Sequence, residues 1–268
     1  MNSYLKSVVR QIAPKMVAEL YSRYIKKTGF WGNYASWKEA SEKADGYDSK
    51  IIFDKVKDSL LKVKKGEAAY ERDSVLFDQV EYSWPLLATL LWIASENANK
   101  LNILDFGGSL GSTYFQNLLF LRHLPELHWN IVEQAMFVHY GNECFADEHL
   151  QFFPTIGECI AAKQPRAILL SSVISYMEEP YDLLVEIERY GFQYIIFDRT
   201  PFVRQGDERL TIQRVSPSIY KASYPAWFFN EKKFLHIFSN TYNLIAEFAA
   251  SDKANIPCVF KGFIFKRK

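Results

Sequence analysis

Glycines and acidic residues gather in the middle of the chain in an arrangement that could bind a ligand. The segment Ile103–Ser112 reads Ile-Leu-Asp-Phe-Gly-Gly-Ser-Leu-Gly-Ser, an apolar run that ends in Asp105 and is followed by glycines. Glycines after a buried strand let the backbone approach a ligand, because no Cβ stands in the way. Glu133 lies 22 residues after Gly111 and ends a second apolar run. An acid near this spacing can accept hydrogen bonds from ribose hydroxyls.

The loop lacks the pattern of a dinucleotide site. The pattern G-x-G-x-x-G lets backbone amides reach a pyrophosphate, and no register of Gly107, Gly108 and Gly111 supplies it. Asp105 stands just before the loop, where a carboxylate is unfavourable for a diphosphate and suits a cationic amine. A ligand with a ribose and an ammonium group, and without phosphates, is S-adenosylmethionine. We expect this cofactor; the alternative is a nucleotide-dependent oxidoreductase, which the missing glycine pattern disfavours.

The rhythm of the chain after residue 99 predicts the elements that position these residues. Five short apolar runs read as strands, at 101–106, 128–134, 150–156, 166–173 and 193–200. Helix-like segments separate them, for example at 112–122, 135–147 and 181–190. This alternation indicates an α/β protein with a parallel sheet and helices on both sides. Two further runs, 242–250 and 258–267, have no helix between them and predict an antiparallel pair that closes the sheet.

The first part of the chain has mostly helical apolar spacing. We therefore divide the 268 residues into a helical N-terminal extension, 1–98, which caps the site, and a ligand-binding domain, 99–268. A hydrophobic share of 49% and a charged share of 24% fit an ordinary globular protein of this size.

The charges, cysteines and histidines of the chain limit which partners, location and metals can be expected. The chain has 32 Lys plus Arg against 31 Asp plus Glu, so it lacks the large net positive charge that would attract nucleic acid. Residues 1–27 carry a local net charge of +5, which allows a peripheral membrane contact, a helix packed on its own domain or a dimer contact. Three distant cysteines, no apolar run of about 18 residues and no leader-like start predict a cytoplasmic protein. The five histidines have no metal-ligand spacing, so we expect no metal; the oligomeric state stays open.

The glycine segment resembles motif I of the class I S-adenosylmethionine-dependent methyltransferases, acid-x-Gly-x-Gly-x-Gly. Ser109 replaces the middle glycine, which leaves the path of the loop open. The segment 170–178 resembles the strand that passes under the cofactor in this family. The resemblance implies a Rossmann-like, seven-stranded, mostly parallel sheet of order 3-2-1-4-5-7-6. It also implies a set of cofactor-binding residues: Asp105, Gly107, Gly108, Ser109, Gly111, Glu133, Gln134, Ser171 and Ser172.

A narrower resemblance covers the chain from about residue 30 to the end. Four features are similar to a bacterial methyltransferase group often associated with cell-surface polysaccharide genes. They are Trp37 with Ala40 and Gly46-Tyr47, the run Tyr70-Glu71-Arg72-Asp73, the glycine loop, and Asp198-Arg199-Thr200-Pro201. The resemblance implies methylation of an oxygen of a sugar or small polysaccharide precursor. A non-catalytic binding protein on the same fold is the other alternative.

The acceptor must bind at the same edge of the sheet as the cofactor. Asp198 could take a hydroxyl proton, Arg199 could hold an acceptor phosphate or carboxylate, and Tyr176 follows the fourth strand. An ion pair between Asp198 and Arg199 is the structural alternative. Arg72 could pair with the methionine carboxylate or be an ordinary solvated charge. Aromatic residues between the fifth and sixth strands could line an acceptor pocket or pack in the core: Tyr220, Tyr224, Pro225 and Trp227.

Overall fold

The computed structural model describes residues 28–45 and 49–268. The basic segment 1–27 and the Gly46-Tyr47 pair lie outside the described residues. Within the described part of the chain, no helix is both long enough and apolar enough to cross a membrane.

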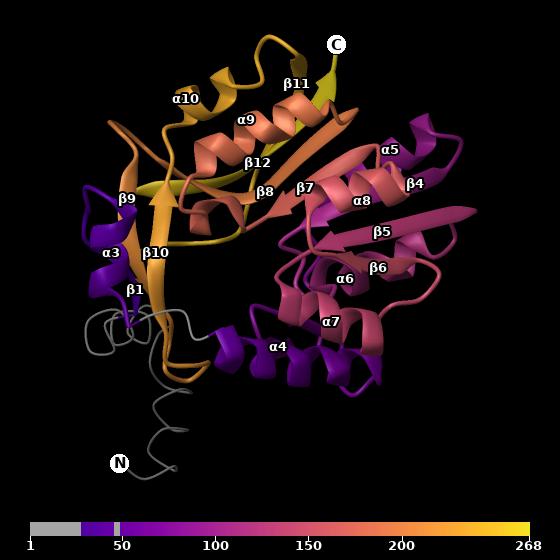
Figure 1. Ribbon diagram of the computed structural model, residues 1–268, viewed down its shortest axis with the longest axis horizontal. Coiled ribbons are helices and arrows are strands. Elements are labelled where there is room, and N and C mark those ends of the chain that lie inside the picture. Colours follow the sequence, from indigo (N-terminus) through magenta and orange to yellow (C-terminus); the bar gives the residue numbers. More distant parts are fainter. Residues whose placement is uncertain (1–27, 46–48) are drawn as a thin grey trace.

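A seven-stranded sheet forms the centre of the molecule (Figure 1). Its strands are β4 (Lys100–Phe106), β5 (Glu126–Val132), β6 (Leu150–Phe153), β7 (Ala167–Ser171), β8 (Tyr194–Val203), β11 (Tyr242–Ala249) and β12 (Cys258–Arg267). They lie in the order β11-β12-β8-β7-β4-β5-β6, and β12 runs antiparallel to both of its neighbours. Numbered within this sheet alone, the strands read 3-2-1-4-5-7-6 from the β6 edge. The Rossmann-like, mostly parallel seven-stranded sheet predicted from the sequence is confirmed, as is its closing antiparallel pair.

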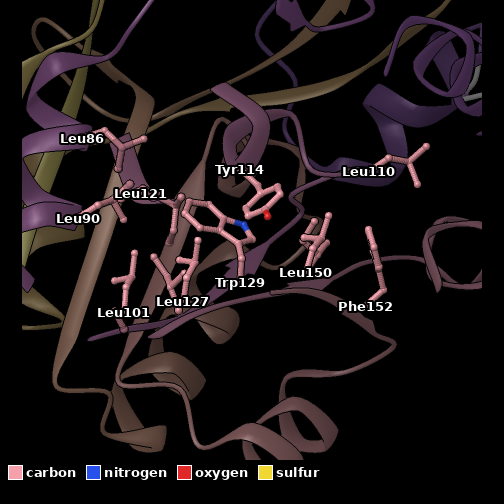
Figure 2. Packing of buried hydrophobic residues seen from close by; sticks show 14 of the residues in the cluster. Leu86, Leu90, Leu101, Leu110, Tyr114, Leu121, Leu127, Trp129, Leu150 and Phe152 are labelled. Atoms are coloured by element: carbon pink, nitrogen blue, oxygen red, sulfur yellow. The ribbon is translucent and has the colours of Figure 1, made fainter. Parts of the chain in front are cut away.

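Helices cover both faces of this sheet (Figure 1). One face carries α4 (Ser49–Lys64), α5 (Trp84–Glu96), α6 (Ser112–Leu121) and α7 (Ala135–Cys144), and the other carries α8 (Ile156–Lys163), α9 (Pro180–Tyr190) and α10 (Glu231–His236). Because successive strand residues point to opposite faces, each face has its own apolar core. Ile103 and Trp129 belong to the first core, and Leu104 and Val132 to the second. Figure 2 shows the first core, where the indole of Trp129 lies beside the ring of Tyr114, with 5.9 Å between their centroids.

A second, three-stranded antiparallel sheet lies beside the large one (left in Figure 1). It consists of β1 (Gly29–Trp31), β9 (Arg209–Arg214) and β10 (Ser223–Phe228) in the order β1-β9-β10. Helix α3 (Trp37–Lys43) packs Ala40 on one face of it, against Leu210 and Ile212. The sequence predicted none of these strands. Residues from the N-terminal extension and from the segment between the fifth and sixth predicted strands thus form one small sheet.

A hairpin of β2 (Tyr70–Arg72) and β3 (Val75–Phe77) is also a departure from the expected helical extension. Its two turn residues, Asp73 and Ser74, have φ of 52° and 66°. Left-handed φ at both positions gives the twist that a two-residue hairpin needs.

Strand β8 contains a bulge. Its register against β12 shifts so that Asp198 and Arg199 together oppose Gly262, and Arg199 has a φ of 55°. A bulge redirects side chains that would otherwise alternate strictly between the two faces. The two residues proposed for the acceptor site therefore stand at an irregular point of the sheet.

We expect the close packing opposite this bulge to require a glycine. A Cβ on Gly262 would overlap the ring of Phe248 on the neighbouring strand. Gly262→Ala should lower the free energy of unfolding by about 1–3 kcal/mol in urea denaturation. Gly157→Ala on α8, where an added Cβ meets nothing within 4 Å, is the matched control and should be neutral or stabilising by up to ~1 kcal/mol. Equal losses in both variants would contradict the packing account.

Candidate functional site

The glycine loop follows β4 and runs directly into α6. This is where the strand order reverses, because β5 lies on one side of β4 and β7 on the other. Gly107, Ser109 and Gly111 have φ of 71°, 58° and 104°. A Cβ on Gly107 would also overlap the side chain of Val173, in the segment that follows β7. The loop therefore needs its first glycine for its backbone angle and for its contact with the neighbouring strand end.

Glu133 meets this loop at the end of β5. The backbone N–H of Ser109 donates to Glu133 Oε1 at 3.3 Å, and the N–H of Gln134 donates to Oε2 at 2.7 Å. Burial raises the pKa of Glu133, and these two hydrogen bonds oppose the rise. The structure brings Ser109, Glu133 and Gln134 together, at the edge where a ribose was expected.

Asp105 lies beneath the loop. Asp105 is only 1% exposed, and its Oδ2 accepts a hydrogen bond from Trp129 Nε1 at 3.0 Å. A Cβ on Gly108 would come within 2.5 Å of the same oxygen. Burial raises the pKa of Asp105 to about 7. In this position the carboxyl group supports the loop from below.

Asp198 lies on β8, paired with Ser171 at the end of β7. It is 2% exposed, and Ser171 Oγ donates to its Oδ2 at 3.0 Å. The N–H of Ser172, a residue with a φ of 55°, donates to the Asp198 carbonyl at 3.0 Å. The other carboxyl oxygen, Oδ1, is buried and has no hydrogen-bond partner among the described residues. Burial raises the pKa of Asp198, and the charge of Arg199 opposes the rise.

Arg199 forms its salt bridges with two other aspartates, not with Asp198. Its Nη2 lies 2.7 Å from Asp73 Oδ2 and 3.0 Å from Asp252 Oδ1. Its Nε lies 3.1 and 3.2 Å from the two oxygens of Asp252. The guanidinium thus joins β8 to the turn of the β2–β3 hairpin and to the segment between β11 and β12.

The hairpin brings Glu71 to the glycine loop, whereas Arg72 points elsewhere. Arg72 pairs with Glu81 at 3.3 Å and lies over the ring of Phe77. Because adjacent strand residues point to opposite faces, Glu71 faces α6, where Ser112 Oγ donates to its Oε2 at 2.5 Å. The run of residues 70–73 was recognised in the sequence, but the importance of Glu71 depends on the hairpin, which was not predicted.

Tyr176 connects the end of β7 to the small sheet. It belongs to the short helix η1 (Ile174–Tyr176), and its hydroxyl donates to Gln213 Oε1 at 2.7 Å. Its ring contacts that of Tyr224 edge to face, with 5.4 Å between centroids. The hydroxyls of Tyr220 and Tyr224 are hydrogen-bonded to each other. Trp227 lies on the other face of β10 and packs in the core under α3, so only part of the expected aromatic group reaches this edge.

Backbone strain concentrates at the same edge. Five of the non-glycine residues with positive φ belong to the contacts described above: Asp73, Ser74, Ser109, Ser172 and Arg199. Such conformations cost about 1–3 kcal/mol each and persist where surrounding contacts fix them, commonly at functional sites.

Residues 28–45 and 49–268 contain no group of three or more His, Cys, Asp or Glu that could hold a metal ion.

A cavity of about 340 Å³ lies between the ends of β4 and β5 and the helices α8 and α9. Its lining combines apolar side chains, including Phe106, Val132 and Leu183, with the polar groups of Thr155, Glu186 and Tyr190.

Comparisons with known proteins give only distant likenesses to solved structures. No family model matches it, and no curated protein matches it significantly. Among solved structures it is similar to the N-terminal domain of EvdMO1, determined in the presence of S-adenosylhomocysteine and D-fucose. That likeness has 13% identity and a TM-score of 0.47, over 83% of this chain and 98% of that one.

Two further solved structures are similar to the chain at comparably low identity. The 1,6-didemethyltoxoflavin-N1-methyltransferase of Burkholderia thailandensis shows 11% identity and a TM-score of 0.44, over 90% of this chain and 94% of that one. The magnesium protoporphyrin IX methyltransferase of Synechocystis PCC 6803 shows 12% identity and a TM-score of 0.44, over 69% and 79%. Likenesses at this level concern the fold, and the chemistry below is inferred from the residues of the site.

The buried carboxyl of Glu71 predicts a pH dependence of stability. Burial raises its pKa to about 7, against an ordinary value of 4.5. The folded state then holds a proton that the unfolded state has lost, so this contribution is complete below about pH 4.5 and disappears as the pH rises through 7. Glu71→Gln, which keeps the shape of the protonated form, should raise the free energy of unfolding at pH 8 by roughly 1–3 kcal/mol and flatten its fall between pH 5 and 8.

The control is Glu67→Gln, on an exposed side chain in the connection between α4 and β2. It should leave the profile of the wild type unchanged. Urea denaturation at several pH values measures both variants. A Glu71→Gln profile with the same slope as the wild type would show that this carboxyl is ionised in the folded protein at pH 5 as well as at pH 8.

Proposed function

We propose that the protein is an S-adenosylmethionine-dependent methyltransferase that methylates an oxygen of a small acceptor, a sugar or another polysaccharide precursor. The observation that carries this proposal is the meeting of Glu133 with the glycine loop after β4. A second observation supports it: on β8 of the same sheet, a buried carboxyl oxygen of Asp198 has no hydrogen-bond partner among the described residues. A cytoplasmic location and the division of the chain at residues 98 and 99 belong to the same proposal. The first part of the chain would cap the site through the β2–β3 hairpin.

The residues of the loop fit this cofactor. Glu133 offers carboxylate oxygens to ribose hydroxyls, and Gly107 and Gly108 leave the backbone accessible. Ser109 Oγ is buried and lacks a hydrogen-bond partner among the described residues, so a ligand there would satisfy it. The loop has no glycine spacing for a pyrophosphate. When bound, S-adenosylmethionine supplies an electrophilic methyl group on a sulfonium.

Asp198 is the residue we propose to act on the acceptor. Its Oδ1 would accept a hydrogen bond from an acceptor hydroxyl and take the proton as the oxygen attacks the methyl group. Ser171 fixes the orientation of the carboxyl group through Oδ2. The raised pKa of Asp198 strengthens it as a base, because a carboxylate with a higher pKa binds the proton more firmly. Holding the acceptor oxygen in line with methyl and sulfur would provide much of the acceleration.

The cofactor assignment predicts that S-adenosylhomocysteine raises the melting temperature of the protein, whereas NAD and NADP do not. Glu133→Gln should weaken the binding of S-adenosylhomocysteine by roughly 10-fold or more, because charged hydrogen bonds contribute about 1.5–3 kcal/mol. Calorimetric titration measures this change in affinity. Glu126→Gln, at the opposite end of the same strand, should bind like the wild type. A melt that responds to NAD and not to S-adenosylhomocysteine would favour the oxidoreductase alternative.

The catalytic assignment predicts that Asp198→Asn keeps the fold and the S-adenosylhomocysteine affinity but transfers methyl groups ~10²–10⁴-fold more slowly. The readout is transfer of a labelled methyl group from S-adenosylmethionine to small molecules of a cell extract. Asp207→Asn, an exposed aspartate in the β8–β9 connection, is the control. Unchanged transfer in Asp198→Asn would exclude this residue as the base. If the wild type binds S-adenosylhomocysteine but transfers no methyl group, the result would favour the alternative of a non-catalytic binding protein.

A further inference from the structure

The charges around Arg199 determine which acceptors can enter this edge of the sheet. Two carboxylates, Asp73 and Asp252, share one guanidinium whose side chain is only 18% exposed. Both Nε and Nη2 already donate to them. The three groups together carry a net charge of −1, so an anion that approached the guanidinium would also meet two carboxylates.

Two basic side chains near Arg199 have other partners. Arg72 in the hairpin pairs with Glu81, and Lys261, opposite Thr200 on β12, pairs with Glu231 at 2.9 Å. In the described part of the chain, no cation besides Arg199 forms a salt bridge with the aspartates at this edge. Asp198 adds a further carboxyl group. A phosphate or carboxylate entering here would meet negative charge at short range, where the repulsion is poorly screened.

The remaining groups at this edge are neutral and suited to a hydroxylated ring. Tyr176, Tyr220 and Tyr224 are partly exposed, and Gln213 lies with them on the small sheet. Burial raises the pKa of Tyr176 and of Tyr224, so both hydroxyls stay uncharged. Aromatic faces with a few hydroxyl and amide groups bind rings and direct their polar substituents.

We propose that the part of the acceptor bound here is a neutral hydroxylated ring without phosphate or carboxylate, and that Arg199 is a positioning residue. This inference rests on the proposed methyltransferase function. It differs from the sequence-based expectation that Arg199 would hold an acceptor anion. In the proposed arrangement, Arg199 instead holds the hairpin and the segment after β11 around the acceptor.

Inorganic phosphate is the probe that tests the proposal, with the full chain and potassium chloride of matched ionic strength as reference. The melting temperature of the wild type should not respond to phosphate. The double variant Asp73→Asn with Asp252→Asn releases the guanidinium, and phosphate should then raise its melting temperature by about 2–5 °C near tenfold saturation. Adding Arg199→Gln to the double variant should abolish that rise. If the double variant does not fold, Asp73→Asn alone replaces it, since that carboxylate is 62% exposed.

A phosphate-dependent rise in the wild type that Arg199→Gln abolishes would overturn the proposal, because Arg199 would then be an anion receptor. Absence of any rise in the variant with the released guanidinium would overturn it as well. The same melts with S-adenosylhomocysteine test the underlying function separately. Loss of that response would refute the cofactor assignment, whatever phosphate does.

Discussion

The double salt bridge of Arg199 is the interaction on which this edge of the protein depends. It joins three segments that are distant in sequence: the bulge of β8, the hairpin turn at Asp73 and the chain at Asp252. Glu71, two residues before Asp73, attaches the same hairpin to Ser112 at the start of α6. The hairpin therefore joins the start of α6, directly after the glycine loop, to the bulge of β8, and so connects the residues proposed for the cofactor with those proposed for the acceptor.

This frame explains why strained and buried polar groups persist here. A buried carboxyl group is costly without partners, and Asp105, Glu71 and Asp198 are each fixed by at least one hydrogen bond. Their pKa values rise because burial outweighs those hydrogen bonds. The left-handed residues of the loop, the turn and the bulge are held by the same contacts. A preorganised site of this kind aligns reactants without further rearrangement.

The large sheet could be predicted from the sequence because its strands are buried runs that alternate with helices. The small sheet could not: β1 has three residues, and its partners β9 and β10 lie between two longer elements. The hairpin turn is Asp73-Ser74, without the glycine that usually marks such turns, so the hairpin was not predicted. The sequence offered Arg72 as a cofactor residue or a solvated charge and did not single out Glu71. The bulge at Asp198 and Arg199 depends on pairing with Gly262, which no local pattern reveals. The spacing of the acids and glycines was enough to predict at which edge of the sheet the candidate site lies. The directions in which Glu71, Arg72 and Arg199 point could be seen only in the tertiary structure.

The most direct test of the account is backbone amide hydrogen exchange with and without S-adenosylhomocysteine. The account predicts slower exchange in the glycine loop at 105–113 and after β5 at 133–136, with little change around the cavity lined by residues 154–157 and by α9. Protection around that cavity, together with unchanged exchange in the glycine loop, would contradict the proposed cofactor site.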